Sequence, residues 1–127
     1  MIMFKIKNID HIVLTTENLQ KCCDFYQNIL NMDLEEKNGR YALKFGNQKI
    51  NIHQKKGEFQ PAATYPTSGS LDFCLIVEDI LQVKAELESK NYPIELGIVE
   101  RMGAISKLKS IYLKDPDGNL VELASKI

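Results

Sequence analysis

The feature that most constrains this chain is a pattern of predicted elements that occurs twice, about 60 residues apart. A β-branched run at 9–15 leads into an amphipathic helix, and three short strand-like runs follow at 34–37, 41–45 and 49–53. The same order then begins again with an apolar strand at 71–77. Two copies are too few for a solenoid, so they favour two half-barrels related by a pseudo-twofold axis.

Corresponding positions in the two halves support this repeat. His11 and Asp72 lie 61 residues apart, each near the start of a strand that leads into a helix. Asn31 and Asn91 lie 60 residues apart, each where a helix gives way to a strand. Because the halves share little identity, the order of elements carries the inference. We expect an α+β fold of two βαβββ modules, whose curled mixed sheets surround a cup.

Capping and breaking residues bound both predicted helices. Asn18 is a candidate N-cap for an amphipathic helix of about 14 residues, which Asn31 closes. The second helix begins at Glu78–Asp79 and ends before Pro93, because proline cannot continue a helix. The Asn-Gly pair at 38–39 lies between two strand-like runs and predicts a tight hairpin.

Turn and loop signals separate the remaining elements. The Asp-Pro-Asp-Gly run at 115–118 predicts a turn, with proline second and glycine fourth. Residues 97–107 are polar and contain glycine, so we expect a loop there, with Arg101 in it. We expect a single domain over 1–127. Its parts are a first module at about 5–56, a linker at about 57–69 and a second module at about 70–127.

Charge and cysteine content exclude several classes of partner. The 127 residues carry a net charge of −1 at pH 7, so no basic excess favours nucleic acid or anionic lipid. Neither a membrane-spanning apolar run nor a signal peptide is recognisable. Cys22, Cys23 and Cys74 form no CxxC pair and are expected as free thiols. We therefore expect a cytoplasmic protein without a nucleic-acid or membrane partner.

Strand alternation places polar side chains on the faces that turn away from the apolar core. On these faces we expect five polar side chains, namely His11, Asn51, His53, Asp72 and Glu122. Unpaired carboxylates among apolar neighbours would cost several kcal/mol, so something must compensate them. A divalent cation held by imidazole and carboxylates is one answer, and a hydrogen-bonded structural network is the other.

Three segments carry a resemblance to a known family. They are IDHIVL at 9–14, FYQNILNM at 25–32 and DPDGNLVEL at 115–123. With these segments the chain resembles the vicinal-oxygen-chelate superfamily, which comprises glyoxalases, bleomycin-resistance proteins and dioxygenases. Within that superfamily it is most similar to glyoxalase-domain-containing proteins of the "virulence protein" type, through KINIH at 49–53, PTSGS at 66–70 and IYLKDPD at 111–117.

The resemblance implies a divalent metal ion, zinc, nickel, manganese or iron, held by the first and fourth strands of each module. Carried over to this chain, the implied ligands are His11, His53, Asp72 and Glu122, with Asn51 as the alternative to His53. Asp72 takes a position that often holds histidine, and Asn51 takes one that holds glutamate in glyoxalase I. Glu122 is also the implied catalytic group, because a carboxylate there can move a proton.

Three kinds of activity are compatible with this resemblance. The first is a metal-dependent lyase or isomerase, in which the metal acts as a Lewis acid on the vicinal oxygens of a small-molecule substrate. The second is a non-catalytic protein that sequesters an antibiotic or other small molecule, as bleomycin-resistance proteins do, and the third is a thiol transferase or dioxygenase. Arg101 and Asn51 are expected to contact the ligand, although Arg101 can equally be a solvated loop charge. By analogy with the family, we expect a homodimer.

Overall fold

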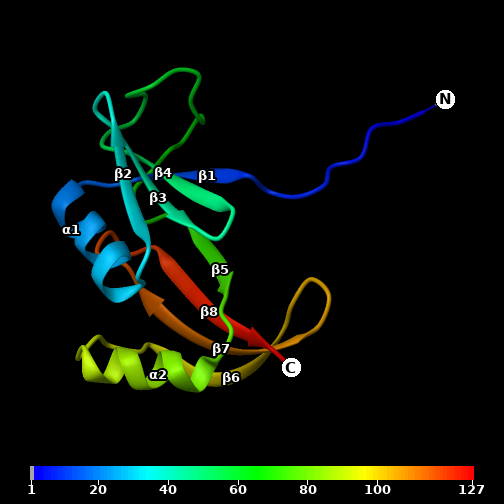
Figure 1. Ribbon diagram of the computed structural model, residues 1–127. Helices are drawn as coiled ribbons and strands as arrows, with labels where there is room; N and C mark the ends of the chain where they lie inside the picture. Colours follow the sequence, from blue (N-terminus) through cyan, green and yellow to red (C-terminus); the bar gives the residue numbers. More distant parts are fainter. Residues whose placement is uncertain (1) are drawn as a thin grey trace.

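The computed structural model describes residues 2–127 and contains two four-stranded mixed sheets (Figure 1). The first has the order β1-β4-β3-β2 and is built from His11–Thr15 (β1), Asp33–Lys37 (β2), Arg40–Phe45 (β3) and Gln48–His53 (β4). The second has the order β5-β8-β7-β6 and is built from Asp72–Ile76 (β5), Leu96–Met102 (β6), Lys107–Lys114 (β7) and Leu120–Lys126 (β8). In each sheet the first and last strands of the half pair in parallel, and the other pairs are antiparallel. The expected α+β fold is confirmed.

Both helices begin where their capping residues predict. Helix α1 spans Leu19–Asp24, and the Asn18 side chain accepts a hydrogen bond from the backbone N–H of Lys21 at 3.0 Å. A π-helical segment, η1, continues over Phe25–Ile29, so the first helix is shorter than the sequence predicts. It ends because Asn31 adopts a left-handed conformation, with φ of 60°.

The second helix ends in the same way. Helix α2 spans Ile80–Ser89, and the Asp79 side chain caps its first turn by accepting from the N–H of Leu81. Asn91, two residues beyond its end, has φ of 55°. Asparagine tolerates this conformation better than most residues. Because Asn31 and Asn91 are the two asparagines that lie 60 residues apart, their shared geometry confirms the repeat.

The expected loop at 97–107 is wrong, because most of it is strand. Strand β6 runs through Leu96–Met102 and pairs with β7, which leaves only a short turn before Lys107. The pairing register shifts between Gly97 and Val99, and this irregularity disrupts the alternation by which a strand is recognised in sequence. A Cβ on Gly97 would lie 2.7 Å from the carbonyl oxygen of Ser110, so only glycine fits there.

A single apolar core lies between the helices and one face of each sheet. It contains side chains from both halves, among them Leu14, Leu43, Ile50, Ile111 and Val121. Figure 1 shows α1 beside the first sheet and α2 alongside the second. None of the helices within residues 2–127 has the length and apolar character needed to cross a bilayer. The opposite sheet faces are left without a covering helix, and we call them the open faces.

A buried carboxylate joins the two halves. Asp115, in the turn between β7 and β8, accepts a hydrogen bond from the Tyr26 hydroxyl at 2.7 Å and from the Asn119 amide at 2.8 Å. Its second oxygen accepts from the backbone N–H groups of Asp117 and Asn119, at 3.0 and 2.9 Å. Tyr26 belongs to η1 in the first half and is completely buried. Burial, and then the charge of Asp115, raises the pKa of its hydroxyl far above the usual range, so Tyr26 stays a donor.

Asp117 extends this connection to the start of the first helix. Its carboxylate accepts from the Thr16 hydroxyl at 2.6 Å and from the backbone N–H of Glu17 at 3.0 Å. Asn119, in the same turn, accepts from the N–H of Leu71 at 2.9 Å and so fixes the entry to β5. The expected turn at 115–118 is confirmed by a hydrogen bond from the N–H of Gly118 to the carbonyl of Asp115. This turn and Asn119 also make hydrogen bonds to three segments that are distant in sequence: η1, the residues before α1, and the residue before β5.

We expect Tyr26→Phe to lower the free energy of unfolding by about 1–2 kcal/mol, because it removes one buried hydrogen bond to a carboxylate. Asp115→Ala should cost about 3 kcal/mol or more, because it leaves buried donors without an acceptor. Urea denaturation followed by circular dichroism measures both losses. Tyr92→Phe is the matched control, since the Tyr92 hydroxyl donates to the carbonyl of Lys114 at a more exposed position. Equal losses for the two tyrosine variants would contradict the role given to Asp115.

Candidate functional site on the open faces

The predicted alternation of the first sheet is confirmed by its pairing. In the parallel pair of β1 and β4, His11 lies opposite Lys49, Val13 opposite Asn51 and Thr15 opposite His53. These residues share the open face, because the alternating residues Leu14, Ile50 and Ile52 are buried in the core. The strands therefore present His11, Asn51 and His53 on one surface, as the sequence predicts.

The register of β1 and β4 distinguishes Asn51 from His53 as the second ligand beside His11. Asn51 lies two residues along the strands from the level of His11, whereas His53 lies four residues away. At about 3.3 Å per residue, His53 is displaced by about 13 Å along the strand direction. Its ring instead contacts the Phe59 ring, with a centroid separation of 5.1 Å. Asn51 is thus the closer partner for His11.

The second sheet repeats the same two-residue spacing. Asp72 lies opposite Leu120, and Cys74 lies opposite Glu122, so Asp72 and Glu122 are also two residues apart. Asp72 matches His11 as the first residue of the first strand in its half. Glu122 then matches Asn51. The backbone of each half therefore provides one pair of equivalent positions, filled by different side chains.

Glu122 is held by a residue that the sequence reasoning missed. The hydroxyl of Ser110, on the neighbouring strand β7, donates to the Glu122 carboxylate at 2.6 Å, and Ser110 is completely buried. Cys74 faces the same carboxylate. Burial, followed by the charge and hydrogen bonding of Glu122, raises the pKa of its thiol to about 11. The available signal for Ser110 was its alternation with Tyr112, which places both side chains on the face of Glu122.

His11 lies where the two halves meet. Its side chain is 45% exposed, and Nδ1 lies 2.8 Å from the carboxylate of Asp10. His11 and Cys74 line the same hollow of about 140 Å³, together with Phe45 and Phe73. The edge strands β1 and β5 therefore lie near each other, and the imidazole of His11 is open to the surroundings.

Arg101 occupies a different setting from the one that the sequence predicts. It lies in strand β6 rather than in a loop, and its guanidinium is already engaged. Nε donates to the Tyr112 hydroxyl at 3.1 Å, and Nη1 donates to the carbonyl oxygen of Glu100 at 3.0 Å. Arg101 therefore reaches the open face of the second sheet through Tyr112, but it is not a mobile loop charge.

A second hollow, of about 240 Å³, lies on the open face of the first sheet. Arg40, Asn51, His53 and Phe59 are among the residues that line it. The guanidinium carbon of Arg40 lies 4.0 Å from the centre of the Phe59 ring. Neither Arg40 nor Phe59 was predicted as a site residue. Their contact depends on how the segment after β4 returns to the sheet, and no local pattern records this.

The predicted metal ligands do not gather within one chain. Over residues 2–127, no three histidine, cysteine, aspartate or glutamate side chains lie close enough together to hold a metal ion. His11, His53, Asp72 and Glu122 remain predicted ligands on two separate open faces. These four side chains could bind one metal ion together only if the open face of a first sheet lay opposite the open face of a second sheet.

Two βαβββ halves with polar open faces define the vicinal-oxygen-chelate type of fold. Residues 8–123 match the Glyoxalase/Bleomycin resistance protein/Dioxygenase superfamily, and the chain belongs to this superfamily. Glyoxalase domain-containing protein RDO1 of Mycosarcoma maydis is 40% identical over 121 residues, which cover 94% of this chain and 69% of RDO1. Virulence protein STM3117 of Salmonella typhimurium is 43% identical over 124 residues, covering 96% of this chain and 86% of that protein.

Solved structures agree with this assignment. The crystal structure of STM3117 superposes with a TM-score of 0.94 at 41% identity and covers 98% of this chain and 100% of that one. More distant structures show the fold alone. They include a lactoylglutathione lyase from Agrobacterium tumefaciens, at 21% identity, 94% coverage of each chain and a TM-score of 0.74. Another is TnmS3, an antibiotic binding protein from Streptomyces, at 18% identity, 98% and 100% coverage and the same TM-score.

The contact between Ser110 and Glu122 can be measured by a double-mutant cycle. For Ser110→Ala and Glu122→Ala we expect a coupling energy of about 1–2 kcal/mol, because a buried hydroxyl donates to a charged carboxylate. The matched control is Glu35 with Lys44, a more exposed ion pair at 3.6 Å on the first sheet. Its coupling should stay below about 0.5 kcal/mol. Urea denaturation of the four proteins in each cycle gives both values, and equal couplings would contradict the assignment.

Proposed function

We propose that this protein is a divalent-metal-dependent, glyoxalase-like lyase or isomerase that acts on a small molecule with vicinal oxygens. The observation that carries the proposal is the equal spacing of His11 with Asn51 and of Asp72 with Glu122 on the two open faces. These four side chains offer one imidazole, one amide oxygen and two carboxylates. Nitrogen and oxygen donors of this kind suit zinc, nickel, manganese or iron.

The register favours Asn51 over His53 as the fourth ligand. Asn51 lies at the level that Glu122 occupies in the other half, whereas the His53 ring packs against Phe59. The hydroxyl of Ser110 orients the Glu122 carboxylate, as partners behind metal ligands commonly do. The donor set therefore fits a divalent ion in its chemistry, provided that two open faces meet.

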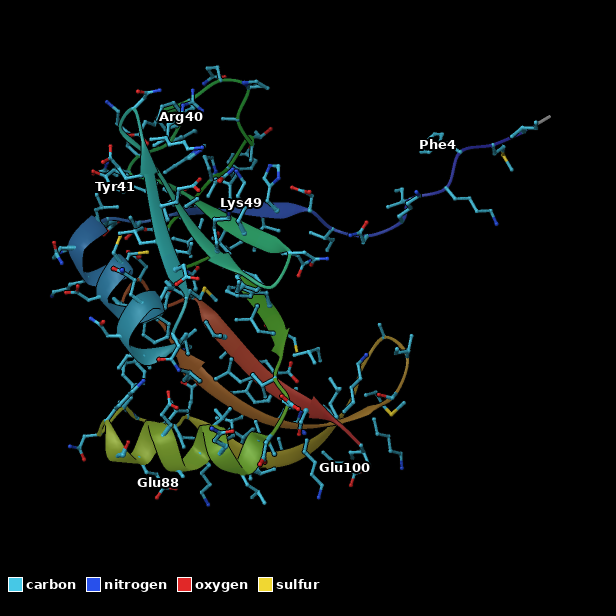
Figure 2. The ribbon with its side chains drawn as sticks, in the orientation of Figure 1. Phe4, Arg40, Tyr41, Lys49, Glu88 and Glu100 are labelled. Carbon is cyan, nitrogen blue, oxygen red and sulfur yellow. The ribbon has the colours of Figure 1, made fainter. Side chains whose placement is uncertain are left out.

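The proposed meeting of faces is a homodimer, in which the first open face of one chain lies opposite the second open face of its partner. Both faces expose apolar side chains, including Val13 and Ile76. The N-terminal segment leads away from the sheets and carries Phe4, which is 90% exposed (Figure 2). Exposed apolar surface of this kind commonly marks an association site. Each ligand set would then come from two chains.

In the proposed reaction, each group on the open faces has a distinct task. A bound divalent ion would act as a Lewis acid on the vicinal oxygens of the substrate. The Glu122 carboxylate, held by Ser110, would accept a proton from the carbon that bears one of those oxygens and deliver it to the adjacent carbon that bears the other. Asn51 would donate its amide N–H to the substrate if it does not ligate the metal. We also propose that the two modules act together as one domain. The three cysteines are free, as is usual in the reducing cytoplasm, where we propose that the protein acts.

A second candidate function is the sequestration of a small molecule without chemistry. It is favoured by the hollow of about 240 Å³ on the first open face, which offers binding surface that does not involve His11, Asp72 or Glu122. TnmS3 shows that this fold is used by an antibiotic binding protein. A sequestering protein needs the open faces but no metal, so metal content separates the two functions.

We expect protein purified without chelators to contain close to one divalent ion per chain. His11→Ala and Glu122→Ala should each lose most of it, because losing one of about four ligands leaves the site incomplete. Metal is measured by atomic emission after gel filtration. Lys109→Ala, which changes an exposed side chain outside the predicted ligand set, is the control and should retain the metal. If neither the wild-type protein nor Lys109→Ala contains close to one metal ion per chain, the metal-dependent function is wrong.

Mixed dimers test whether the site is shared between chains. In a dimer of His11→Ala with Glu122→Ala, one of the two proposed sites carries both substitutions and the other carries neither. We therefore expect unfolding and refolding a mixture of the two variants to restore one metal ion to each mixed dimer. If each chain forms its own site, mixing restores nothing. Restoration therefore supports the shared site, and its absence contradicts it.

A further inference from the structure

Arg40 is an arginine whose charge no other group balances. Over residues 2–127 its guanidinium makes no hydrogen bond and no ion pair, and its central carbon lies 4.0 Å from the centre of the Phe59 ring. Arg101, by comparison, donates to both Tyr112 and Glu100. A guanidinium with free donors matches the geometry of a carboxylate or phosphate group. Of the two arginines in the chain, Arg40 is the one available to a ligand.

The surroundings of Arg40 are positively charged. Lys37 and Lys49 line the same hollow of about 240 Å³, and neither makes an ion pair with another described residue. Glu35 also lines the hollow, but its carboxylate is paired with Lys44 at 3.6 Å. The uncompensated charge in the hollow is therefore positive. Figure 2 shows Arg40 and Lys49 on the first sheet, with Arg40 close to the loop that follows β4.

The loop after β4 holds Arg40 in place. The backbone N–H of Gln54 donates to the Glu58 carboxylate at 3.0 Å, and the N–H of Glu58 donates to the carbonyl of Lys55. These bonds form a tight turn directly before Phe59, whose ring contacts both Arg40 and His53. Stacking on an aromatic ring restrains a guanidinium without using its N–H donors. This contact restricts the Arg40 guanidinium before a ligand arrives, which lowers part of the entropic cost of binding.

We propose that the hollow formed by Arg40, Lys49, Asn51 and Phe59 binds an oxyanion group, a carboxylate or a phosphate, on the small molecule that the open faces bind. The proposal rests on the proposed function, because it places this group beside Asn51 and therefore beside the predicted ligand positions. The substrate class narrows to anionic molecules with vicinal oxygens, such as 2-oxo acids or phosphorylated carbonyl compounds. Arg40 is then a determinant of specificity rather than a catalytic residue.

The experiment measures anion binding without the metal. Protein is stripped with a chelator, dialysed free of it, and titrated with pyruvate, inorganic phosphate and the neutral ester methyl pyruvate while ¹H–¹⁵N correlation spectra are recorded. The Nε–H signal of Arg40 and the side-chain amide of Asn51 report on the hollow. We expect at least one of the two anions to shift both signals, with a Kd of about the millimolar order, and the ester not to shift them.

Variants identify which arginine is responsible. Arg40→Gln should weaken anion binding by about 10-fold or more, because charge-assisted hydrogen bonds are lost. Arg40→Lys should weaken it by less, since the charge remains but the forked geometry does not. Lys109→Gln, which removes one positive charge from the second sheet, is the control for net charge and should bind like wild type. Urea midpoints verify that each variant is folded.

Each outcome decides the proposal. Arg40-dependent binding of pyruvate, phosphate or both supports it and identifies the preferred group. The proposal is overturned if methyl pyruvate binds as well as the anions, or if neither anion binds. It is also overturned if binding is lost in Arg101→Gln but not in Arg40→Gln. Because the protein is metal-free, the result is independent of the metal assay. Anion binding in a protein that never carries metal would retain the oxyanion site and reject the lyase, and the reverse result would retain only the lyase.

Discussion

The buried carboxylate of Asp115 is the group on which the relative position of the two sheets depends. It accepts hydrogen bonds from the hydroxyl of Tyr26 in the first half and from its own turn in the second. An acceptor of this kind, with three of its four hydrogen bonds buried, is costly to disturb. The apolar core is continuous through both halves, but apolar packing alone would leave their relative orientation less defined. The directional hydrogen bonds of Asp115 specify that orientation.

The repeat supplies two equivalent backbones, and the side chains have diverged between them. His11 and Asp72 share one position, and Asn51 and Glu122 share the other. The two predicted carboxylate ligands lie on the second open face, whereas the unbalanced cations Lys37, Arg40 and Lys49 lie on the first.

Much of the fold could be predicted from the sequence, because most strands bury one face and their alternation records it. Strand β6 beyond Leu96 was predicted as a loop, since it is an edge strand with few buried residues and its register shifts near Gly97. The candidate ligand positions could be predicted from alternation and family resemblance. Ser110, Arg40 and Phe59 could not, because their roles arise only when neighbouring strands are placed in register and a loop folds back. The bond between Tyr26 and Asp115 spans 89 positions of sequence, a separation that local patterns do not encode.

The turn that carries Asp115 and Asp117 also affects how such a fold can change over evolutionary time. The covalent connection between the halves runs through residues 54–70, but the polar contacts that orient the halves lie mainly elsewhere. This connection contributes Phe59 to the positively charged hollow beside Arg40 but makes few of the contacts that orient the two sheets. Insertions and deletions there can therefore reshape this hollow without moving the strands that carry the predicted ligands. The connecting segment can thus change in length and composition while β3 and β4, which carry Arg40, Lys49 and Asn51, keep their register.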